Sequence, residues 1–486
     1  MVVEKLFENV NIRTVFGEMP PEITGIEDRA SEVKEGYAFF ARKGSVSDGA
    51  NYALEAVKNG AVMVVSETPL DTGVANVVVE DVKNALAKCA KKFYVGENPE
   101  IKIIGVVGTN GKTTICHVLY EIFGYAGIKA GYVGTIGNGF DGFEEESGLT
   151  TPGTVELYKL IGRMEKAGVK YFIMELSAHA IEQRRAEEVY FECLIFTNCT
   201  EDHLDYFKDM ETYSAVKKSV FLNDKCRYKV INSDDRTGMA IISETEGRCI
   251  TYGIYNPADV FAIDISETKN GVSFIINLFD VIYDISSPLI GLGNVYNLLA
   301  CLATAAGFGI KIHTLSGAVR KITAVSGRTE KIATVRGADV YLDYAHTPDG
   351  LKTTLNSMRK ICDGRLYCLF GCGGNRETEK RKTMGEISGV ISDFSIITSD
   401  NPRYEDPCSI ISEIESGIRK VTRNYISISD RKEALKYAVS LLKDGDVLVV
   451  AGKGAEKYQE VMGVKRSFSD ADEIKYAISE NNGDKS

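Results

Sequence analysis

The segment Ile103–Thr114, with the sequence IIGVVGTNGKTT, combines residue types that can bind a nucleoside triphosphate. An apolar run leads into a loop with Gly108 and Gly111, and Lys112 and Thr113 then open a segment with helical spacing of apolar residues. Small residues let backbone N–H groups surround phosphate oxygens, and a helix N-terminus adds the positive end of its dipole. We expect Lys112 to contact the β- and γ-phosphates and the Thr113 hydroxyl to bind Mg²⁺.

The loop departs from the literal phosphate-loop pattern G-x-x-x-x-G-K-[ST] at one position. The first glycine of that pattern would fall at Val106, whereas this chain has Gly108 inside the loop. A glycine-rich turn that merely starts a helix is the simpler alternative. The order of strand, loop, Lys-Thr pair and helix favours the nucleotide site.

An acid and a histidine follow two further apolar runs. Glu175 follows Tyr171–Met174, and the stretch Asn198–His203 follows Cys193–Thr197. Ligands of doubly wound sheets bind at the carboxyl ends of strands, so both side chains are expected beside the phosphate loop. Mg²⁺ prefers oxygen ligands and keeps waters, which makes Glu175 and His203 candidate metal ligands. Taken singly, a helix N-terminal acid and a polar core histidine are the alternatives.

Strand-like and helix-like segments alternate along the chain, which predicts an α/β protein with parallel sheets. Breaks at GENPE (96–100) and SGRTEK (326–331) predict three domains, at residues 1–98, 99–328 and 329–486. Further strands are expected at Tyr37–Ala41, Ala61–Ser66, Val74–Val79, Ile101–Val107, Val340–Leu342, Leu366–Phe370, Phe394–Thr398 and Val447–Val450, and helices at Tyr52–Asn59, Val82–Tyr94 and Asp430–Leu442.

The composition fits a globular protein of several domains: 486 residues, 44% apolar and 26% charged. A net charge of −11 argues against a nucleic-acid partner and leaves local basic sites for anionic ligands. No signal peptide and no run of about 18 apolar residues is visible, so no membrane insertion is expected. Eleven scattered cysteines without a C-x-x-C pair indicate reduced thiols in a cytoplasmic protein.

Eight motifs follow one another in a single order along nearly the whole chain: GTNGKTT (108–114), LTTP (149–152), MELSAH (174–179), TNCTEDHLDY (197–206), Tyr213-x-x-x-Lys217, GLGNVYNLLA (291–300), SGRTEK (326–331) and LDYAHTPDGL (342–351). Their order and spacing resemble the Mur ligases, the ATP-dependent amide-forming enzymes of peptidoglycan precursor synthesis. The resemblance implies an N-terminal α/β domain for the UDP-linked substrate, a central P-loop-type ATPase domain with a parallel sheet, and a C-terminal Rossmann-like domain for the amino acid.

The resemblance also implies roles for individual residues. Catalytic roles fall to Lys112, Glu175, His203 and Lys217. Nucleotide contacts fall to Gly108, Thr109, Asn110, Gly111, Lys112, Thr113, Thr114, Asn294, Asn297, Arg328 and Asp343. Contacts to the muramoyl-peptide substrate fall to Thr150, Thr151, Ser177, Gln183 and Arg185. The implied ligands of Mg²⁺ are Thr113, Glu175, His203 and Lys217.

Lys217 matches a lysine that is carbamylated in many members of the family. As N6-carboxylysine it would change from a cation into an anionic oxygen ligand for a second Mg²⁺. The alternative is a solvated helix lysine like its neighbour Lys218.

Three C-terminal motifs resemble the family members that add the third residue of the stem peptide: GCGGNR (371–376), DNPR (400–403) and AGKGAE (451–456). In those members DNPR accompanies meso-diaminopimelate, so the implied substrates are UDP-MurNAc-L-Ala-D-Glu and meso-diaminopimelate. Diaminopimelate has a distal carboxylate that lysine lacks, and the guanidinium of Arg403 can bind it with two hydrogen bonds. A proline-containing turn is the alternative for DNPR. The implied amino-acid contacts are Arg376, Asp400, Asn401, Arg403, Gly452 and Glu456.

Two segments depart from the family pattern. The usual Asp-Ser-Arg before a V-x-x-G turn is replaced in Glu27–Gly36, where Ala30 and Ser31 stand at the Ser and Arg positions. The residues that hold uridine are therefore not predicted. The usual G-K-G-H-E has Ala455 for its histidine and retains Glu456.

The implied reaction begins when ATP phosphorylates the side-chain carboxylate of D-Glu, and the amine of diaminopimelate then attacks the acyl phosphate. Catalysis of this kind depends on positioning and charge neutralisation. We expect a monomer whose C-terminal domain closes over the substrates. Alternatives are a lysine-adding, folylpolyglutamate or cyanophycin ligase, which DNPR and GCGGNR disfavour, and a catalytically degenerate binding protein. A GTPase would need an N-K-x-D motif, which is absent.

Overall fold

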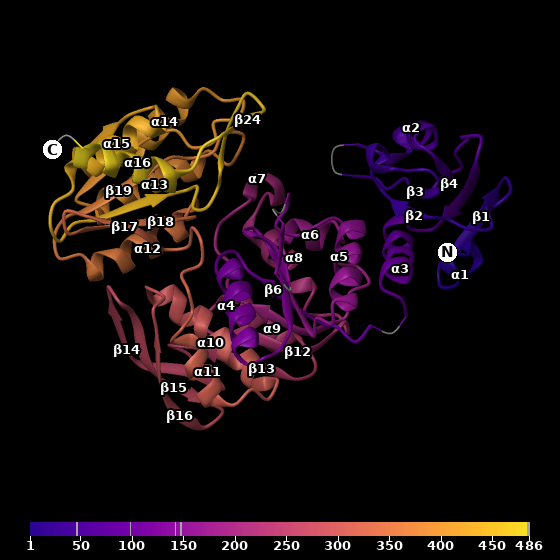
Figure 1. Cartoon of the computed structure of the whole chain (residues 1–486), viewed down its shortest axis with the longest axis horizontal. Coiled ribbons are helices and arrows are strands. Elements are labelled where there is room, and N and C mark those ends of the chain that lie inside the picture. The colour runs from indigo at the N-terminus through magenta and orange to yellow at the C-terminus, as the bar shows by residue number, and fades with distance from the viewer. Residues whose placement is uncertain (45–46, 98, 141, 146–147, 484–486) are drawn as a thin grey trace. The chain divides into compact units, whose positions relative to one another are not determined.

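The computed structural model describes residues 1–44, 47–97, 99–140, 142–145 and 148–483 (Figure 1). The chain divides into two compact units. Unit 1 comprises Met1–Gly105, Ile128–Leu194 and Asn223–Arg227, and unit 2 comprises Val106–Gly127, Ile195–Leu222 and Tyr228–Ser486. The division falls inside three strands, β6 (Lys102–Val107), β11 (Phe191–Phe196) and β12 (Cys226–Asn232).

The N-terminal part of unit 1 is a sheet in the order β1-β5-β4-β3-β2, in which β1 alone runs antiparallel to its neighbour. Successive residues of β3 face opposite sides, as the period of two in a strand requires. Phe40 packs in a hydrophobic cluster with side chains of α3. Phe39 packs in another hydrophobic cluster, with side chains of α2. The elements are α1 (Val3–Leu6), β1 (Ile12–Phe16), β2 (Gly25–Glu27), β3 (Tyr37–Phe40), α2 (Ala53–Lys58), β4 (Ala61–Ser66), β5 (Ala75–Val79) and α3 (Val82–Tyr94).

The second part of unit 1 carries the buried strand β10, which pairs in parallel with β7. Two antiparallel hairpin pairings then join β7 to β8 and β8 to β9. β10 ends at Glu175, and α6 begins shortly afterwards at Ala178. The elements are β7 (Ala130–Gly134), β8 (Gly137–Phe140), β9 (Phe143–Glu145), α5 (Thr154–Lys166), β10 (Tyr171–Glu175) and α6 (Ala178–Glu182).

The first part of unit 2 contains the nucleotide-loop helix α4 and the long apolar helix α10. The parallel strands β12, β13 and β14 continue into an antiparallel run, β14 to β15 to β16. The elements are α4 (Lys112–Tyr125), α7 (Leu204–Phe207), α8 (Met210–Ser219), α9 (Arg236–Glu244), β13 (Cys249–Gly253), β14 (Val260–Thr268), β15 (Gly271–Leu278), β16 (Val281–Ser287), α10 (Leu292–Gly307) and α11 (Ile312–Val319).

The C-terminal part of unit 2 is a sheet in the order β17-β18-β22-β19-β20-β21, parallel except at β17. A two-stranded hairpin, β23 with β24, follows. The elements are β17 (Glu330–Val335), β18 (Ala338–Asp343), α12 (Pro348–Ile361), β19 (Leu366–Phe370), α13 (Glu379–Ile391), β20 (Phe394–Ile397), α14 (Pro407–Ile418), β21 (Tyr425–Ser427), α15 (Arg431–Leu441), β22 (Val447–Ala451), β23 (Tyr458–Val461), β24 (Val464–Ser467) and α16 (Asp470–Gly483).

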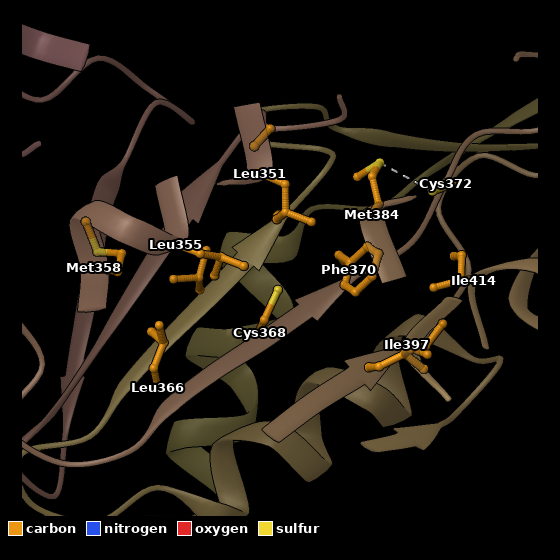
Figure 2. Close-up of a cluster of buried hydrophobic side chains, with 14 of the residues drawn as sticks. Leu351, Leu355, Met358, Leu366, Cys368, Phe370, Cys372, Met384, Ile397 and Ile414 are labelled. Atoms are coloured by element: carbon orange, nitrogen blue, oxygen red, sulfur yellow. Dashed lines mark hydrogen bonds between the residues drawn. The ribbon is translucent and has the colours of Figure 1, made fainter. Parts of the chain in front are cut away.

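Helices cover both faces of this C-terminal sheet, which is the doubly wound arrangement. Cys368 and Phe370 of β19 pack against residues of α12, α13 and α14, among them Leu355 and Met384 (Figure 2). Leu369 of the same strand packs in a second cluster with residues of α15 and α16. A strand that is buried on both faces has a continuous run of apolar residues, and β19 has such a sequence, LYCLF.

The α/β fold class is confirmed, and most predicted elements match within one or two residues. Leu366–Phe370, Ala61–Ser66 and Val82–Tyr94 have the predicted bounds, whereas the antiparallel strands β14 to β16 were not predicted. The domain limits near residues 98 and 328 stay a prediction, and Asn98 lies outside the described residues. Among the helices that the structure describes, none combines the length and apolar character needed to cross a membrane.

Candidate functional site

The predicted phosphate loop connects β6 to α4 and packs against the residues that follow β11. The backbone N–H of Thr109 donates to the carbonyl of Asn198 at 2.9 Å. A Cβ on Gly108 would lie 1.8 Å from Oγ1 of Thr197. Gly111 has φ of 89°, and its Cβ would lie 2.5 Å from Oδ1 of Asn297. Both glycines are therefore required by close approach to neighbouring segments.

Lys112 and Thr113 lie where the loop becomes a helix, as predicted. Nζ of Lys112 donates to the carbonyls of Gly108 at 2.8 Å and Thr109 at 2.9 Å, so the ammonium folds back over the loop. Oγ1 of Thr113 accepts a hydrogen bond of 2.8 Å from Nη2 of Arg328. The loop thus brings together an ammonium, a guanidinium and a hydroxyl, which suits a polyphosphate.

The remaining predicted nucleotide contacts lie on three segments of unit 2. Nδ2 of Asn297 donates to Oδ1 of Asn294 at 2.9 Å, on the first turns of α10. The guanidinium of Arg328 lies 4.3 Å from the ring centre of Tyr344. Asp343 accepts hydrogen bonds within unit 2, including one of 2.7 Å from the N–H of Thr329. Asp343 therefore orders the segment that carries Arg328.

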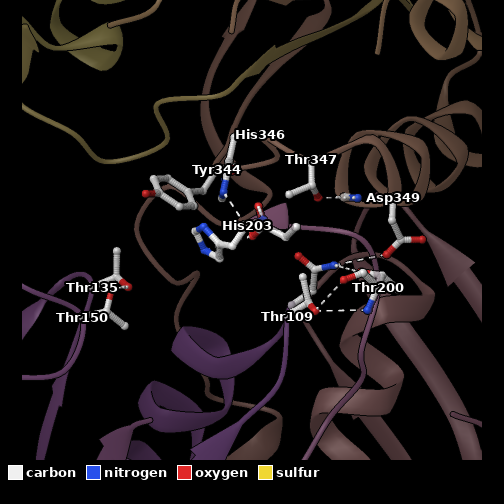
Figure 3. Close-up of polar contacts among 12 residues, drawn as sticks. Thr109, Thr135, Thr150, Thr200, His203, Tyr344, His346, Thr347 and Asp349 are labelled. Carbon is white, nitrogen blue, oxygen red and sulfur yellow. Dashed lines mark hydrogen bonds and ion pairs between the residues drawn. The ribbon is translucent and has the colours of Figure 1, made fainter. Parts of the chain in front are cut away.

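Asn110 connects the loop to two other segments (Figure 3). Its N–H donates to Oδ1 of Asn198 at 2.9 Å. Its Nδ2 lies 3.2 Å from Oδ2 of Asp349, at the start of α12, and 3.4 Å from Oγ1 of Thr200. Thr114 follows as a buried residue of α4.

Lys217 is fully buried and contacts the phosphate loop. Its Nζ donates to Oγ1 of Thr109 at 2.6 Å and lies 3.9 Å from the ring centre of Tyr213. The pKa of Lys217 is lowered to about 7, chiefly by burial and also by the nearby ammonium of Lys112, against the opposing effect of Cys199. A solvated helix lysine is excluded, because Lys217 has no exposed surface.

His203 lies in a small histidine–carboxylate cluster that also contains Asp202, a residue that sequence reasoning passed over. Nε2 of His203 is 3.3 Å from Oδ2 of Asp202, and Nε2 of His346 is 3.9 Å from the same oxygen (Figure 3). Burial would raise the pKa of Asp202, but His346, His203 and Lys380 hold it below its ordinary value. The signal was available, since Asp202 stands directly before His203 and His346 lies in another motif.

Glu175 and the predicted muramoyl-peptide contacts form a hydrogen-bonded network in unit 1. Oε1 of Glu175 accepts from the N–H of Thr135 at 2.7 Å, and Oγ1 of Thr151 donates to the carbonyl of Glu175 at 2.7 Å. Ser177 caps α6, and its N–H donates to Oγ1 of Thr151 at 3.0 Å. Glu175 is 1% exposed, which makes it a buried carboxylate.

Three more predicted substrate contacts lie beside this network. Nη1 of Arg185 donates to the carbonyl of Thr151 at 2.7 Å, and its Nη2 donates to Oε1 of Gln183 at 2.7 Å. Oγ1 of Thr150 lies 3.1 Å from Oγ1 of Thr135 (Figure 3). The structure therefore brings the five predicted muramoyl-peptide contacts into the same part of unit 1.

The predicted amino-acid contacts meet at the carboxyl ends of β20 and β22, and we call Asp400, Asn401, Gly452 and Glu456 the strand-end cluster. Nδ2 of Asn401 donates to Oε2 of Glu456 at 2.9 Å. A Cβ on Gly452 would lie 2.6 Å from Oδ2 of Asp400. Lys453, which sequence reasoning did not single out, is fully buried and lies 3.0 Å from Glu456.

Two arginines flank Gly373 beside the strand-end cluster. A Cβ on Gly373 would lie 3.0 Å from Nη1 of Arg403 and 3.8 Å from both Cγ of Arg376 and the carbonyl of Asn401. Nη1 of Arg403 donates to the carbonyl of Gly374 at 2.7 Å. The guanidinium of Arg403, with the stem of Arg376 nearby, lies beside the polar strand-end cluster, and this arrangement can bind an amino acid that carries a second carboxylate.

The segment that departs from the family pattern has internal partners for its acids. Oε2 of Glu27 accepts from Nζ of Lys159 at 2.9 Å, and Asp28 pairs with Arg42. Ala30 is buried at the start of a short 3₁₀ turn. The structure therefore gives Ala30 a packing role and leaves the uridine contacts unassigned.

A metal site at Thr113, Glu175, His203 and Lys217 stays a prediction. Within the ranges that the structure describes, no three His, Cys, Asp or Glu side chains gather as a metal centre. The predicted metal site differs from such a centre, because a threonine hydroxyl and a carbamate oxygen would supply two of its ligands. Its protein groups fit Mg²⁺, since a buried carboxylate and a helix-terminal hydroxyl are hard oxygen donors.

Three family models match the chain in succession. The Mur ligase family catalytic domain matches residues 22–94, the Mur ligase middle domain residues 106–305, and the Mur ligase glutamate ligase domain residues 327–454. The chain is 38% identical to the UDP-N-acetylmuramoyl-L-alanyl-D-glutamate–2,6-diaminopimelate ligase of Caldanaerobacter subterraneus subsp. tengcongensis, covering 94% of this chain and 95% of the relative. It is 39% identical to the protein of the same name from Aquifex aeolicus, covering 93% of each.

Solved structures are also similar. A structure of a UDP-N-acetylmuramoyl-L-alanyl-D-glutamate–2,6-diaminopimelate ligase aligns with a TM-score of 0.71 and 30% identity over 99% of each chain. The MurF ligase of Thermotoga maritima in complex with ADP shares the fold, with a TM-score of 0.65 and 18% identity over 95% of this chain and 98% of that one. The chain therefore belongs to the Mur ligase family.

Proposed function

We propose that the chain is an ATP-dependent amide ligase that adds meso-diaminopimelate to UDP-MurNAc-L-Ala-D-Glu in peptidoglycan precursor synthesis. The observation that carries the choice of amino acid is the position of Arg403, whose guanidinium lies beside Gly373 and the strand-end cluster. Relatives that cover more than nine-tenths of the chain carry the name of this enzyme, which supports the same choice.

The nucleotide loop supports the first half of the reaction, phosphorylation of the D-Glu side chain by ATP. In this proposal Nζ of Lys112 leaves the carbonyls of Gly108 and Thr109 and contacts the β- and γ-phosphates. Arg328 lies next to Thr113 and adds a second cation. Cations fixed around the transferring phosphoryl group lower the barrier because they neutralise its charge in the transition state.

In the second half, the amine of diaminopimelate attacks the acyl carbon of the phosphorylated D-Glu and phosphate leaves. Arg403 and Arg376 would bind the distal carboxylate, and the strand-end cluster would bind the remaining polar groups. Lysine lacks the distal carboxylate, so it would not form the bidentate hydrogen bonds that a carboxylate makes with a guanidinium, which disfavours it as an acceptor.

Magnesium and a carbamate complete the proposed site. Thr113, Glu175, His203 and carbamylated Lys217 would hold Mg²⁺, which supplies charge neutralisation on the phosphates when bound. Carbamylation requires a neutral amine, and a pKa of about 7 gives the buried Lys217 a large neutral fraction at neutral pH. Nζ of Lys217 already contacts Thr109, so a carbamate there would lie beside the phosphate loop.

Phosphate release tests the proposed function. The purified enzyme is supplied with ATP, MgCl₂ and UDP-MurNAc-L-Ala-D-Glu, and with meso-diaminopimelate, L-lysine, D-glutamate or no amino acid. We expect release with meso-diaminopimelate only, and its loss when EDTA removes the divalent cation. Activity with L-lysine and none with meso-diaminopimelate would overturn the choice of amino acid. Absence of activity with every acceptor would support a catalytically degenerate Mur-like protein.

We also propose that the enzyme acts as a cytoplasmic monomer. None of the eleven cysteines forms a disulfide, which suits a reducing compartment. Light scattering coupled to size exclusion tests the oligomeric state, and a mass of twice 53.3 kDa would contradict a monomer.

A further inference from the structure

Arg431 and Asp470 form an ion pair in the interior of the C-terminal domain. Both side chains have no exposed surface. Nε of Arg431 lies 2.7 Å from Oδ1 of Asp470, and Nη2 lies 2.7 Å from Oδ2, so the pair is bidentate. Arg431 is the first residue of α15 and Asp470 the first residue of α16.

The same guanidinium contacts the ends of two central strands. Nη1 of Arg431 donates to the carbonyl of Ser399 at 3.3 Å, just after β20. Nη2 donates to the carbonyl of Ala451 at 3.2 Å, the last residue of β22. The next residues in the chain are Asp400 and Gly452, two members of the strand-end cluster.

A buried ion pair is an expensive way to gain stability. Removing two charges from water costs several kcal/mol, and apolar residues of similar volume often stabilise such a site equally well. What an apolar pair cannot supply is a set of directed hydrogen bonds to two carbonyl groups. Arg431 makes both of these bonds from one rigid planar group, which sets the spacing between the two strand ends.

That spacing matters for the strand-end cluster. Gly452 has φ of 107° and passes so close to Asp400 that a Cβ on Gly452 would lie 2.6 Å from Oδ2 of Asp400. Asn401, which follows Asp400, bonds Glu456 on the β22 side at 2.9 Å. A change in the separation of the two strand ends would therefore move the polar groups of the cluster apart.

We propose that Arg431 and Asp470 are positioning residues for the amino-acid site: the guanidinium fixes the two strand ends, and Asp470 holds the guanidinium in place. The inference rests on the proposed function, because it assigns the strand-end cluster to the amino-acid substrate. Neither residue touches that substrate, so their effect is on the geometry of Asp400, Asn401 and Gly452.

The experiment replaces the pair by apolar residues of similar volume in the full-length enzyme, as the double variant Arg431→Met/Asp470→Leu. Steady-state phosphate release gives KM for each of the three substrates and kcat. We expect KM for meso-diaminopimelate to rise about tenfold, a loss of about 1.4 kcal/mol of binding. KM for ATP and for UDP-MurNAc-L-Ala-D-Glu should stay at wild-type values, because the pair does not contact the nucleotide loop.

A matched control is available on the same two helices. Lys432 and Glu473 are the neighbours of the pair along α15 and α16, and their ion pair of 3.2 Å is half exposed at the lysine. The double variant Lys432→Met/Glu473→Leu removes an ion pair between the same helices without touching the strand ends. All of its kinetic constants should match those of the wild type.

The single variant Arg431→Lys keeps the positive charge and loses the planar guanidinium with its directed hydrogen bonds. It provides the test if the apolar double variant does not fold. It should also raise KM for meso-diaminopimelate, with a thermal midpoint close to that of the wild type. A wild-type KM for meso-diaminopimelate in a folded variant of either kind overturns the positioning role. A wild-type enzyme that shows no diaminopimelate-dependent release defeats the proposed function instead, and the two failures are thereby distinguished.

Discussion

Nζ of Lys217 donates a hydrogen bond of 2.6 Å to Oγ1 of Thr109, so a wholly buried lysine is attached to the phosphate loop. The two residues are 108 positions apart in the chain. Burial deprives the charged ammonium of the hydration that it would have in water, and this favours the neutral amine. The contact therefore couples the protonation of Lys217 to the structure of the nucleotide site.

The first prediction concerns the pH dependence of stability for unmodified enzyme in CO₂-free buffer. Lys217 has a pKa of about 7 in the folded state against an ordinary value of 10.5. Between these values the unfolded chain binds more protons, so the contribution of Lys217 makes stability rise with pH from about 7 to 10.5. Below pH 7 the full cost of the buried charge remains, and above 10.5 it is gone.

Thermal midpoints measured from pH 6 to 10 check this prediction. Lys217→Met should lack the rise that the wild type shows over that range. Lys218→Met is the matched control, because Lys218 lies on the same helix and pairs at the surface with Glu244 at 2.7 Å. Parallel curves for the wild type and Lys217→Met would contradict the lowered pKa.

The second prediction concerns the close approach of the phosphate loop to the end of β11. Gly108→Ala places a methyl group 1.8 Å from Oγ1 of Thr197, so either the loop or the Thr197 side chain must move. We expect loss of ATP binding by calorimetry and a lower thermal midpoint. Gly124→Ala, in α4, meets no atom within 4 Å and should leave both unchanged or raise the midpoint slightly. Normal ATP binding by Gly108→Ala would show that the loop geometry is not needed.

Local patterns predicted most of the fold because buried parallel strands are short apolar runs bounded by turns. LYCLF and AVMVVS were found in this way, and their strands have the predicted bounds. β14 has a mixed pattern of buried and exposed residues and pairs antiparallel to β15, so it carried no such run. The phosphate loop was predicted from a contiguous motif, which is a local property.

The parts of the site that were missed depend on contacts between distant segments. Asp202 becomes important because His346, 144 positions away, lies 3.9 Å from its carboxylate. The burial of Lys217 likewise arises from the packing of α8 against the loop; the motif Tyr213-x-x-x-Lys217 singled out the residue but did not predict its burial. Residue types near a motif could be predicted, whereas burial and pairing between distant segments of the chain could not.

The third prediction concerns the ammonium of Lys112. Lys112→Met should lower kcat for phosphate release by at least about 10³-fold, because a fixed cation that stabilises the transferring phosphoryl group is lost. The fold should be intact, since the bonds of Nζ of Lys112 to the carbonyls of Gly108 and Thr109 lie within one loop. Lys129→Met removes a comparable bond, of 3.0 Å to the carbonyl of Ala167, and should keep wild-type kcat. Near-normal turnover by Lys112→Met would contradict the assigned role.

The fourth prediction concerns acceptor recognition by Arg403. Arg403→Lys keeps a positive charge but cannot form two parallel hydrogen bonds with a carboxylate. We expect KM for meso-diaminopimelate to rise about 100-fold, a loss of about 2.8 kcal/mol, while KM for ATP stays constant. The preference for meso-diaminopimelate over L-lysine should fall by a similar factor, since only the distal carboxylate distinguishes the two at this position.

The bond between Nη1 of Arg403 and the carbonyl of Gly374, 2.7 Å long, holds the guanidinium beside Gly373. Arg423→Lys is the matched control, because Arg423 is an exposed arginine outside the strand-end cluster. Competition between meso-diaminopimelate and L-lysine, followed by product mass, measures the preference directly. An unchanged preference in Arg403→Lys would mean that the distal carboxylate is bound elsewhere, with Arg376 as the next residue to replace, since its Cγ lies 3.8 Å from the same point above Gly373.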